Sequence, residues 1–202
     1  MEAEVYWDSR VQRYRYKDNN RFVSRTAVNA ITTRQIKAST DKISTLTDSM
    51  ISGEITFLQW QLRFAEELRS IHTRTAAIAR GGVDQMKNTD WLAIANILRE
   101  EYRYFRNFAS DIKSGNLSAL AIKSRSRLYI RRATLSGEKM RQSVAVSKGD
   151  TQMQRFLGAT DKHCEDCLNY ASLGIVAIGG LPLPTQQCQC RANCKCRVVY
   201  YP

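Results

Sequence analysis

The chain has 202 residues, of which 31 are Lys or Arg and 19 are Asp or Glu, so its net charge is +12. No stretch approaches the ~20 consecutive apolar residues that a helix needs to cross a bilayer, which argues against a membrane-spanning protein. A balance this basic favours contact with nucleic acid, an anionic membrane surface or an acidic protein surface.

Residues 1–21 are aromatic and basic and lack the spacing of a helix. The opening MEAEVYWDSR has no apolar core, so it predicts no secretory signal and a product made in the cytoplasm. Tyr, Trp and Arg are also the residue types that most often anchor interfaces. We predict an arm that stands apart from the core; the alternative is an arm that folds back onto its own domain.

Residues 22–149 predict a helical body. A polar first helix covers 22–52, with Ile36, Ile43 and Met50 seven residues apart, and Gly53 marks its end. The second helix ends at Gly81-Gly82. Its expected apolar stripe consists of Ile55, Leu58, Leu62, Ala65, Leu68, Ile71 and Ile78.

The third helix starts at a cap on Thr89 or Asp90 and stops before Gly115. We expect Trp91 and Phe105 to be core residues on its wide apolar face. A fourth helix follows Ser118 and closes near Ser136-Gly137. Short glycine-containing connections then predict a mainly α protein, a bundle of about four long, mainly antiparallel helices.

Positive charge is concentrated late in this body. Residues 99–141 hold 11 Lys or Arg against 4 Asp or Glu. The segment predicts either an anion-facing surface or simply a solvated helix face.

Residues 150–202 predict a small cysteine-rich module with a closing strand at 197–201. All six cysteines stand here, as Cys164-x-x-Cys167 and then Cys188-x-Cys190-x-x-x-Cys194-x-Cys196. A CxxC turn and a second close-spaced cluster are typical of a structural zinc site, which can fold a segment with little apolar core.

The favoured zinc ligands are Cys164, Cys167, Cys190 and Cys194, with Cys196 as the close competitor to Cys194. Cys188 is then free or outside the first ligand shell, and His163 is a possible substitute ligand. Disulfides are the main alternative, disfavoured in a cytoplasmic product. A redox CxxC would need a βαβ pattern that the sequence lacks.

We predict no enzymatic activity and no catalytic residue. A catalytic zinc needs an open coordination position and a general base, and zinc deaminases supply these with an HxE segment and a PCxxC turn that are both missing here. Only two histidines occur, and His72 is expected to be a structural or surface residue. The sequence also contains no Gly-rich phosphate loop and no GxSxG.

The C-terminal motifs follow one another in a distinctive order. They are Leu157-Gly-Ala-Thr-Asp-Lys-His163-Cys164-Glu-Asp-Cys167, Gly174, Leu181-Pro182 and Cys190-Arg-Ala-Asn-Cys194-Lys-Cys196. This order resembles the end of tailed-phage minor head proteins, also called head-morphogenesis proteins, where Asn-Cys-Arg-Cys is usual. Here Lys195 replaces the Arg, and Cys188 is an addition. Asn20-Arg-Phe-Val23 resembles a Gly-Arg-Phe-Val segment near the start of such proteins.

The resemblance implies a structural virion component, located in the phage head after synthesis in the host cytoplasm. Such a protein would act in head assembly, in several copies, by packing against portal or capsid subunits, with packaged DNA as a further contact through charge. The alternative is a zinc-ribbon nucleic-acid-binding protein that uses Lys162, Arg191, Lys195 and Arg197.

Overall fold

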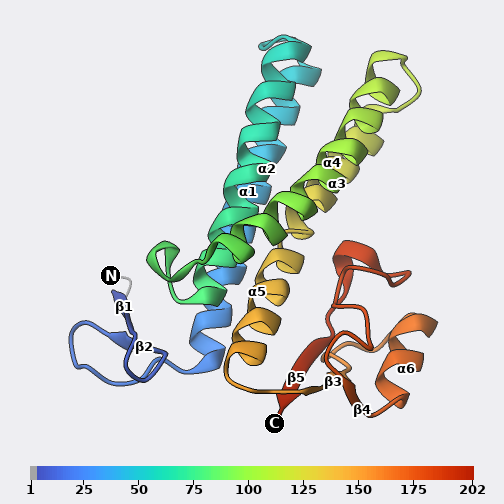
Figure 1. Ribbon diagram of the computed structural model, residues 1–202. Helices are drawn as coiled ribbons and strands as arrows, with labels where there is room; N and C mark the ends of the chain where they lie inside the picture. Colours follow the sequence, from blue (N-terminus) through green and yellow to red (C-terminus); the bar gives the residue numbers. More distant parts are fainter. Residues whose placement is uncertain (1–3) are drawn as a thin grey trace.

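The computed structural model describes residues 4–202, and it confirms a mainly helical fold with short strands and a cysteine cluster near the C-terminus (Figure 1). The body consists of α1 (Arg25–Ile51), α2 (Phe57–Arg80), α3 (Asn88–Lys113), α4 (Ala119–Arg131) and α5 (Thr134–Ser147). A short 3-10 turn, η1 (Val83–Gln85), connects α2 to α3. Within the described part of the chain, no helix is both long and apolar enough to span a membrane.

Local capping sets where the helices begin. Ser24 accepts a hydrogen bond from the Ala27 amide at the start of α1, and Thr56 forms a capping box with Gln59 at the start of α2. Ser118 caps α4 as the sequence predicts. The predicted cap of α3 on Thr89 or Asp90 is wrong: the N-cap residue is Lys87, whose backbone amide donates to Asp90 Oδ2 at 2.9 Å.

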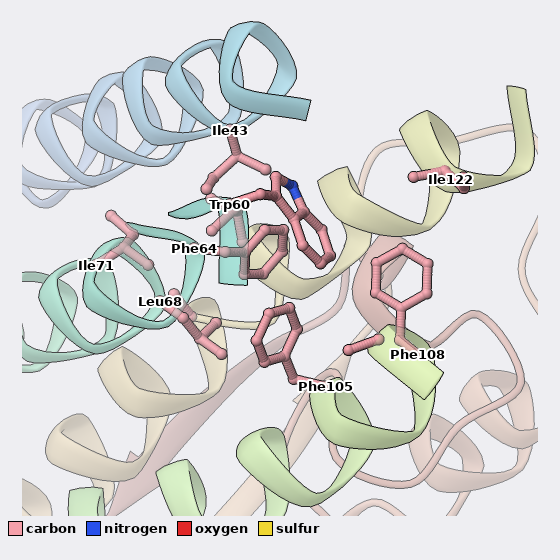
Figure 2. Close-up of a cluster of buried hydrophobic side chains, with 11 residues drawn as sticks. Ile43, Trp60, Phe64, Leu68, Ile71, Phe105, Phe108 and Ile122 are labelled. Atoms are coloured by element: carbon pink, nitrogen blue, oxygen red, sulfur yellow. The ribbon is translucent and has the colours of Figure 1, made fainter. Parts of the chain in front are cut away.

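One aromatic cluster holds the body together (Figure 2). Trp60 and Phe64 of α2 meet Phe105 and Phe108 of α3, and the Phe64 and Phe105 rings stack with centroids 4.5 Å apart. The Trp60 Nε1 donates to Thr47 Oγ1 of α1 at 3.2 Å. The core prediction for Phe105 is therefore confirmed, and Ile43 of α1 is also fully buried.

The predicted stripe on α2 is partly wrong. Leu58 and Leu62 are 64% and 59% exposed, whereas Trp60 and Phe64 are fully buried. Two apolar stripes of α2 lead to Leu68. One contains Leu58, Leu62 and Ala65, and the other contains Trp60 and Phe64. The helix buries the stripe that carries the aromatic rings, because these remove more apolar surface from water.

The core prediction for Trp91 is wrong for a related reason. Trp91 is 37% exposed, while Ile94 faces the core. The helix phase is set by Asp90, which is buried and pairs with Arg80 of α2 at 2.9 Å. Trp91, the next residue along the helix, is consequently turned away from the core.

The predicted fourth helix is in fact two helices, α4 and α5, with the break at Arg132-Ala133. The Ala133 carbonyl at this break accepts a hydrogen bond from Thr75 Oγ1 at 2.9 Å. Gly137 does not end a helix but lies within α5, where the space for a Cβ is 3.5 Å from the Thr75 carbonyl oxygen. This is an ordinary van der Waals distance, so α5 packs closely on α2 at this point.

The N-terminal arm does not stand apart. Strands β1 (Val5–Asp8) and β2 (Arg13–Tyr16) form an antiparallel hairpin that packs on the end of α2; residues 1–3 of the predicted arm lie outside the described range. The Tyr14 hydroxyl donates to the Ile78 carbonyl at 3.0 Å. Gly81 has φ +108°, and the Trp7 ring occupies the space where a Cβ would point.

The C-terminal module is built on the antiparallel sheet β4-β3-β5, with β3 at Gln152–Phe156, β4 at Ile175–Ala177 and β5 at Arg197–Tyr201. The closing strand is thus confirmed, whereas β3, β4 and helix α6 (Glu165–Ser172) are additional. The apolar cluster of the module also contains Leu135 of α5. The predicted boundary near residue 150 falls in the turn between α5 and β3, and the division into domains stays a prediction.

Candidate metal centre

Two separate segments of the module carry the cysteines. Cys164 is the N-cap residue of α6, and Cys167 lies buried in the first turn of that helix. The other four lie around a second 3-10 turn, η2 (Arg191–Asn193), with Cys194 directly after it. The fold therefore brings a helix start and a loop, separated by twenty residues in sequence, against each other.

Four thiols form one compact group. The sulfur atoms of Cys167, Cys188, Cys190 and Cys194 all lie within 4.8 Å of one another, so these four residues could bind a metal ion. Cys190 Sγ lies 3.5 Å from Cys167 Sγ and 3.4 Å from Cys188 Sγ. All six cysteines are free thiols.

The predicted ligands relate to this group in different ways. Cys167, Cys190 and Cys194 belong to it, and Cys188, expected to be free or outside the first shell, lies within it. The Sγ of Cys164 is 3.5 Å from that of Cys190, and Cys196 packs in the same cluster. His163, the possible substitute ligand, is not one of the four residues of the group. Which of these thiols are ligands stays a prediction.

Backbone contacts fix the second cysteine segment. The Gln189 amide donates to Asp166 Oδ2 of α6 at 2.8 Å and so ties the loop to the helix. A Cβ at Gly158 would lie 2.1 Å from the Lys195 carbonyl oxygen. Only glycine allows the chain after β3 to pass this close to the segment between Cys194 and Cys196.

Arg155 is the functional residue that sequence reasoning missed. Its side chain is 1% exposed, and its Nη2 donates to Cys194 Sγ at 3.2 Å and to Cys167 Sγ at 3.4 Å. Its Nη1 donates to the Pro182 carbonyl at 3.0 Å. Among residues 4–202, no carboxylate pairs with this guanidinium. A buried positive charge needs a negative partner, and here the available partners are sulfur atoms.

The electrostatics of the group favour a thiolate at Cys194 and a neutral thiol at Cys167, the two sulfurs that Arg155 contacts. Burial opposes ionisation of Cys194, but amides of Cys196 and Thr185 and the charge of Arg155 outweigh it and lower its pKa to about 7. Burial raises the pKa of Cys167. A metal ion would displace the protons of such thiols, which couples its binding to folding.

The basic residues that lie near the cysteines in sequence are on the surface. Lys162, Arg191 and Lys195 are exposed, as is Arg197, whose guanidinium lies 5.5 Å from the Phe156 ring centroid. These cations are therefore available to solvent in the segments that carry the cysteines.

No family model, no curated protein and no solved structure matches this chain. Inferences about its role therefore rest on its own residues and on the motif order of the C-terminal module.

Proposed function

We propose that this chain is a structural, non-enzymatic protein of the minor head protein type, in which thiol-bound zinc holds the C-terminal module folded. The observation that carries the proposal is that the cysteines of the motif Cys164–Cys196 converge in space around one four-thiol group. The cysteines of the motif that resembles tailed-phage head proteins are therefore also the residues that can bind a metal.

Zinc is the ion that fits these donors best. Thiolates are soft ligands, and sets of four cysteines are typical of closed, tetrahedral structural zinc sites. The Arg155 guanidinium adds hydrogen bonds to two of the sulfurs, as outer-shell donors in metal sites do. Elemental analysis of the purified protein, with a parallel count of free thiols, tests this assignment.

A structural role fits the site better than catalysis. Four protein sulfurs would fill a tetrahedral shell and leave no position for water or substrate. The nearby carboxylate of Asp166 accepts the Gln189 amide and so serves to fix the loop. We infer that the module is a rigid knob, which with the helical body packs against portal or capsid subunits of the phage head.

Sedimentation of assembled heads tests this role. The chain is co-expressed with the portal and capsid proteins encoded in the same genome, and the heads are purified on a density gradient. We expect the chain to sediment with the heads in a few copies and to remain there in high salt. A chain that stays at the top of the gradient would contradict the proposal.

The exposed cations around the sulfur cluster favour one second candidate, a zinc ribbon that binds nucleic acid. Such binding weakens steeply as salt rises, because phosphate contacts release counterions. The double variant Arg191→Glu, Lys195→Glu should then abolish binding to a DNA duplex. In the head-protein proposal the same variant still sediments with heads, so the two functions are separable.

A further inference from the structure

Two cysteines lie outside the four-thiol group yet contact it. Cys164 Sγ is 3.5 Å from Cys190 Sγ and also interacts with Cys167. Cys196 is buried, and its thiol interacts with Cys167 and with Arg155. All six cysteines thus pack in a single cluster, and Tyr170 packs against it. One tetrahedral ion needs only four of them.

Two of the six sulfurs occupy the middle of this cluster. Cys190 lies within 3.5 Å of Cys164, Cys167 and Cys188. Cys167 lies 3.5 Å from Cys190 and 3.8 Å from Cys194, and it also contacts Cys196. The other four sulfurs lie around these two: Cys188 and Cys194 form the four-thiol group with them, and Cys164 and Cys196 contact that group from outside.

The spacing of the sulfurs suits shared ions. Thiolates bound to one tetrahedral zinc at Zn–S distances of about 2.3 Å lie about 3.8 Å apart. The observed separations of 3.4 to 3.8 Å approach this value for pairs on both sides of the cluster. In a Zn₂Cys₆ arrangement two thiolates bridge the ions, and two further thiolates complete the tetrahedron of each ion. The four-thiol group supplies one such tetrahedron, and Cys164 and Cys196 remain to complete the other with the two central sulfurs.

We propose that the six cysteines bind two zinc ions as one binuclear cluster. Cys167 and Cys190 bridge the ions, Cys188 and Cys194 complete the first site, and Cys164 and Cys196 complete the second. This inference rests on the zinc assignment of the proposed function and extends it. Six thiolates and two Zn²⁺ leave a net charge of −2 on the cluster, and the buried guanidinium of Arg155 offsets part of that charge.

Native mass spectrometry of the full chain, purified under reducing conditions with zinc present, tests the stoichiometry directly. We expect two zinc ions per chain. Cadmium substitution should give two ¹¹³Cd signals that couple to each other through the bridging sulfurs. One zinc per chain with two reactive thiols would overturn the binuclear cluster and leave the proposed function intact. No metal, with the thiols oxidised, would overturn both.

Single variants assign the ligands. Cys196→Ser removes a terminal ligand and should reduce the content from two ions to one, whereas Cys167→Ser removes a bridge and should release both. The matched control is His163→Asn, next to Cys164 but outside the cluster, which should keep two ions. Equal metal content in Cys196→Ser and the native chain would contradict the assignment even if Cys167→Ser fails to fold.

Discussion

The helical body and the cysteine module have interiors of different kinds. The main cluster of the body contains eleven buried side chains, four of them aromatic. The apolar cluster of the module contains five, and one of these, Leu135, belongs to α5. Beside it lies a sulfur cluster with a buried guanidinium, a combination that apolar packing alone would not stabilise.

The difference indicates what each region needs in order to fold. Burying an aliphatic or aromatic side chain contributes about 1.5–3 kcal/mol, which an aromatic-rich cluster supplies many times over. Ordering the backbone costs about 1–2 kcal/mol per residue, so a module of this length with so few apolar core residues needs another source of stability. We infer that the body folds through hydrophobic burial and the module through its metal.

Metal removal should have the largest effect on stability. A small effect would contradict the difference inferred between the helical body and the module. Structural zinc in small domains contributes an apparent ~10–16 kcal/mol, so chelation should unfold residues 150–202. We expect protease cleavage within this range, while circular dichroism shows that α1 to α4 persist. Cys167→Ser should reproduce the result without chelator. A protected module in the metal-free protein would show that its fold does not depend on the ion.

Replacing each of the two tryptophans of the body tests whether this region folds through hydrophobic burial. Trp60 is fully buried, so Trp60→Ala should lower the free energy of unfolding by about 3–5 kcal/mol. Trp91→Ala removes the same side chain from a partly exposed position and serves as the matched control, with a loss of about 1 kcal/mol or less. Urea denaturation measures both, and equal losses would refute the core described here.

The sequence predicted the positions of most helices well but took α4 and α5 as a single helix. Stop signals at Gly53 and Gly81 agree with the ends of α1 and α2 because a glycine after a helix adopts a left-handed conformation. The break at Ala133 was missed because its cause is tertiary. The carbonyl is satisfied by Thr75 of another helix, a contact that local sequence does not contain.

For the metal centre, the spacing of the cysteines predicted that they converge but not which sulfurs become neighbours. Cys188 joins the four-thiol group because the turn around η2 brings it beside Cys190. One feature of the sequence could have indicated that Arg155 is buried: it stands two residues after Met153, so both side chains lie on the same buried face of β3. That alternation is detectable only when the segment is known to be a strand, and the sequence did not predict this strand.

His72 should make the stability of the body depend on pH. Burial, with a smaller contribution from the charge of Arg132, lowers its pKa from 6.5 to about 3, and its Nδ1 lies 2.8 Å from Ser136 Oγ. Between these pKa values the unfolded chain binds a proton that the folded chain does not. Stability should therefore fall as pH drops below 6.5, by about 1.4 kcal/mol per unit and about 3 kcal/mol by pH 4.5.

The comparison with His72→Asn isolates this effect. The variant keeps a polar group near Ser136 but does not titrate, so the stability difference between the two proteins should shrink as pH falls from 7 to 4.5. Acid also protonates metal-bound thiolates, but it does so equally in both proteins. Unfolding free energies that run parallel across this range would exclude His72 as the titrating group.

The smallest expected effect concerns the contact between the N-terminal hairpin and the body. Gly81→Ala forces a left-handed conformation on alanine and places its Cβ 2.3 Å from a Trp7 ring atom, so the ring must move. Gly53→Ala imposes a similar left-handed conformation, at φ +82°, where no atom lies within 4 Å, and is the matched control. Both variants should lose about 1–2 kcal/mol from backbone strain.

Gly81→Ala should lose about 1 kcal/mol more than Gly53→Ala, the scale of an aromatic contact. Displacement of the Trp7 ring should also change the chemical shift of its indole N–H, which Gly53→Ala leaves unchanged. If the two variants are equally stable and the indole signal does not move, the hairpin is not held by Trp7. The Tyr14 hydrogen bond to the Ile78 carbonyl would then be its main attachment to α2, because this contact is independent of the side chain at position 81.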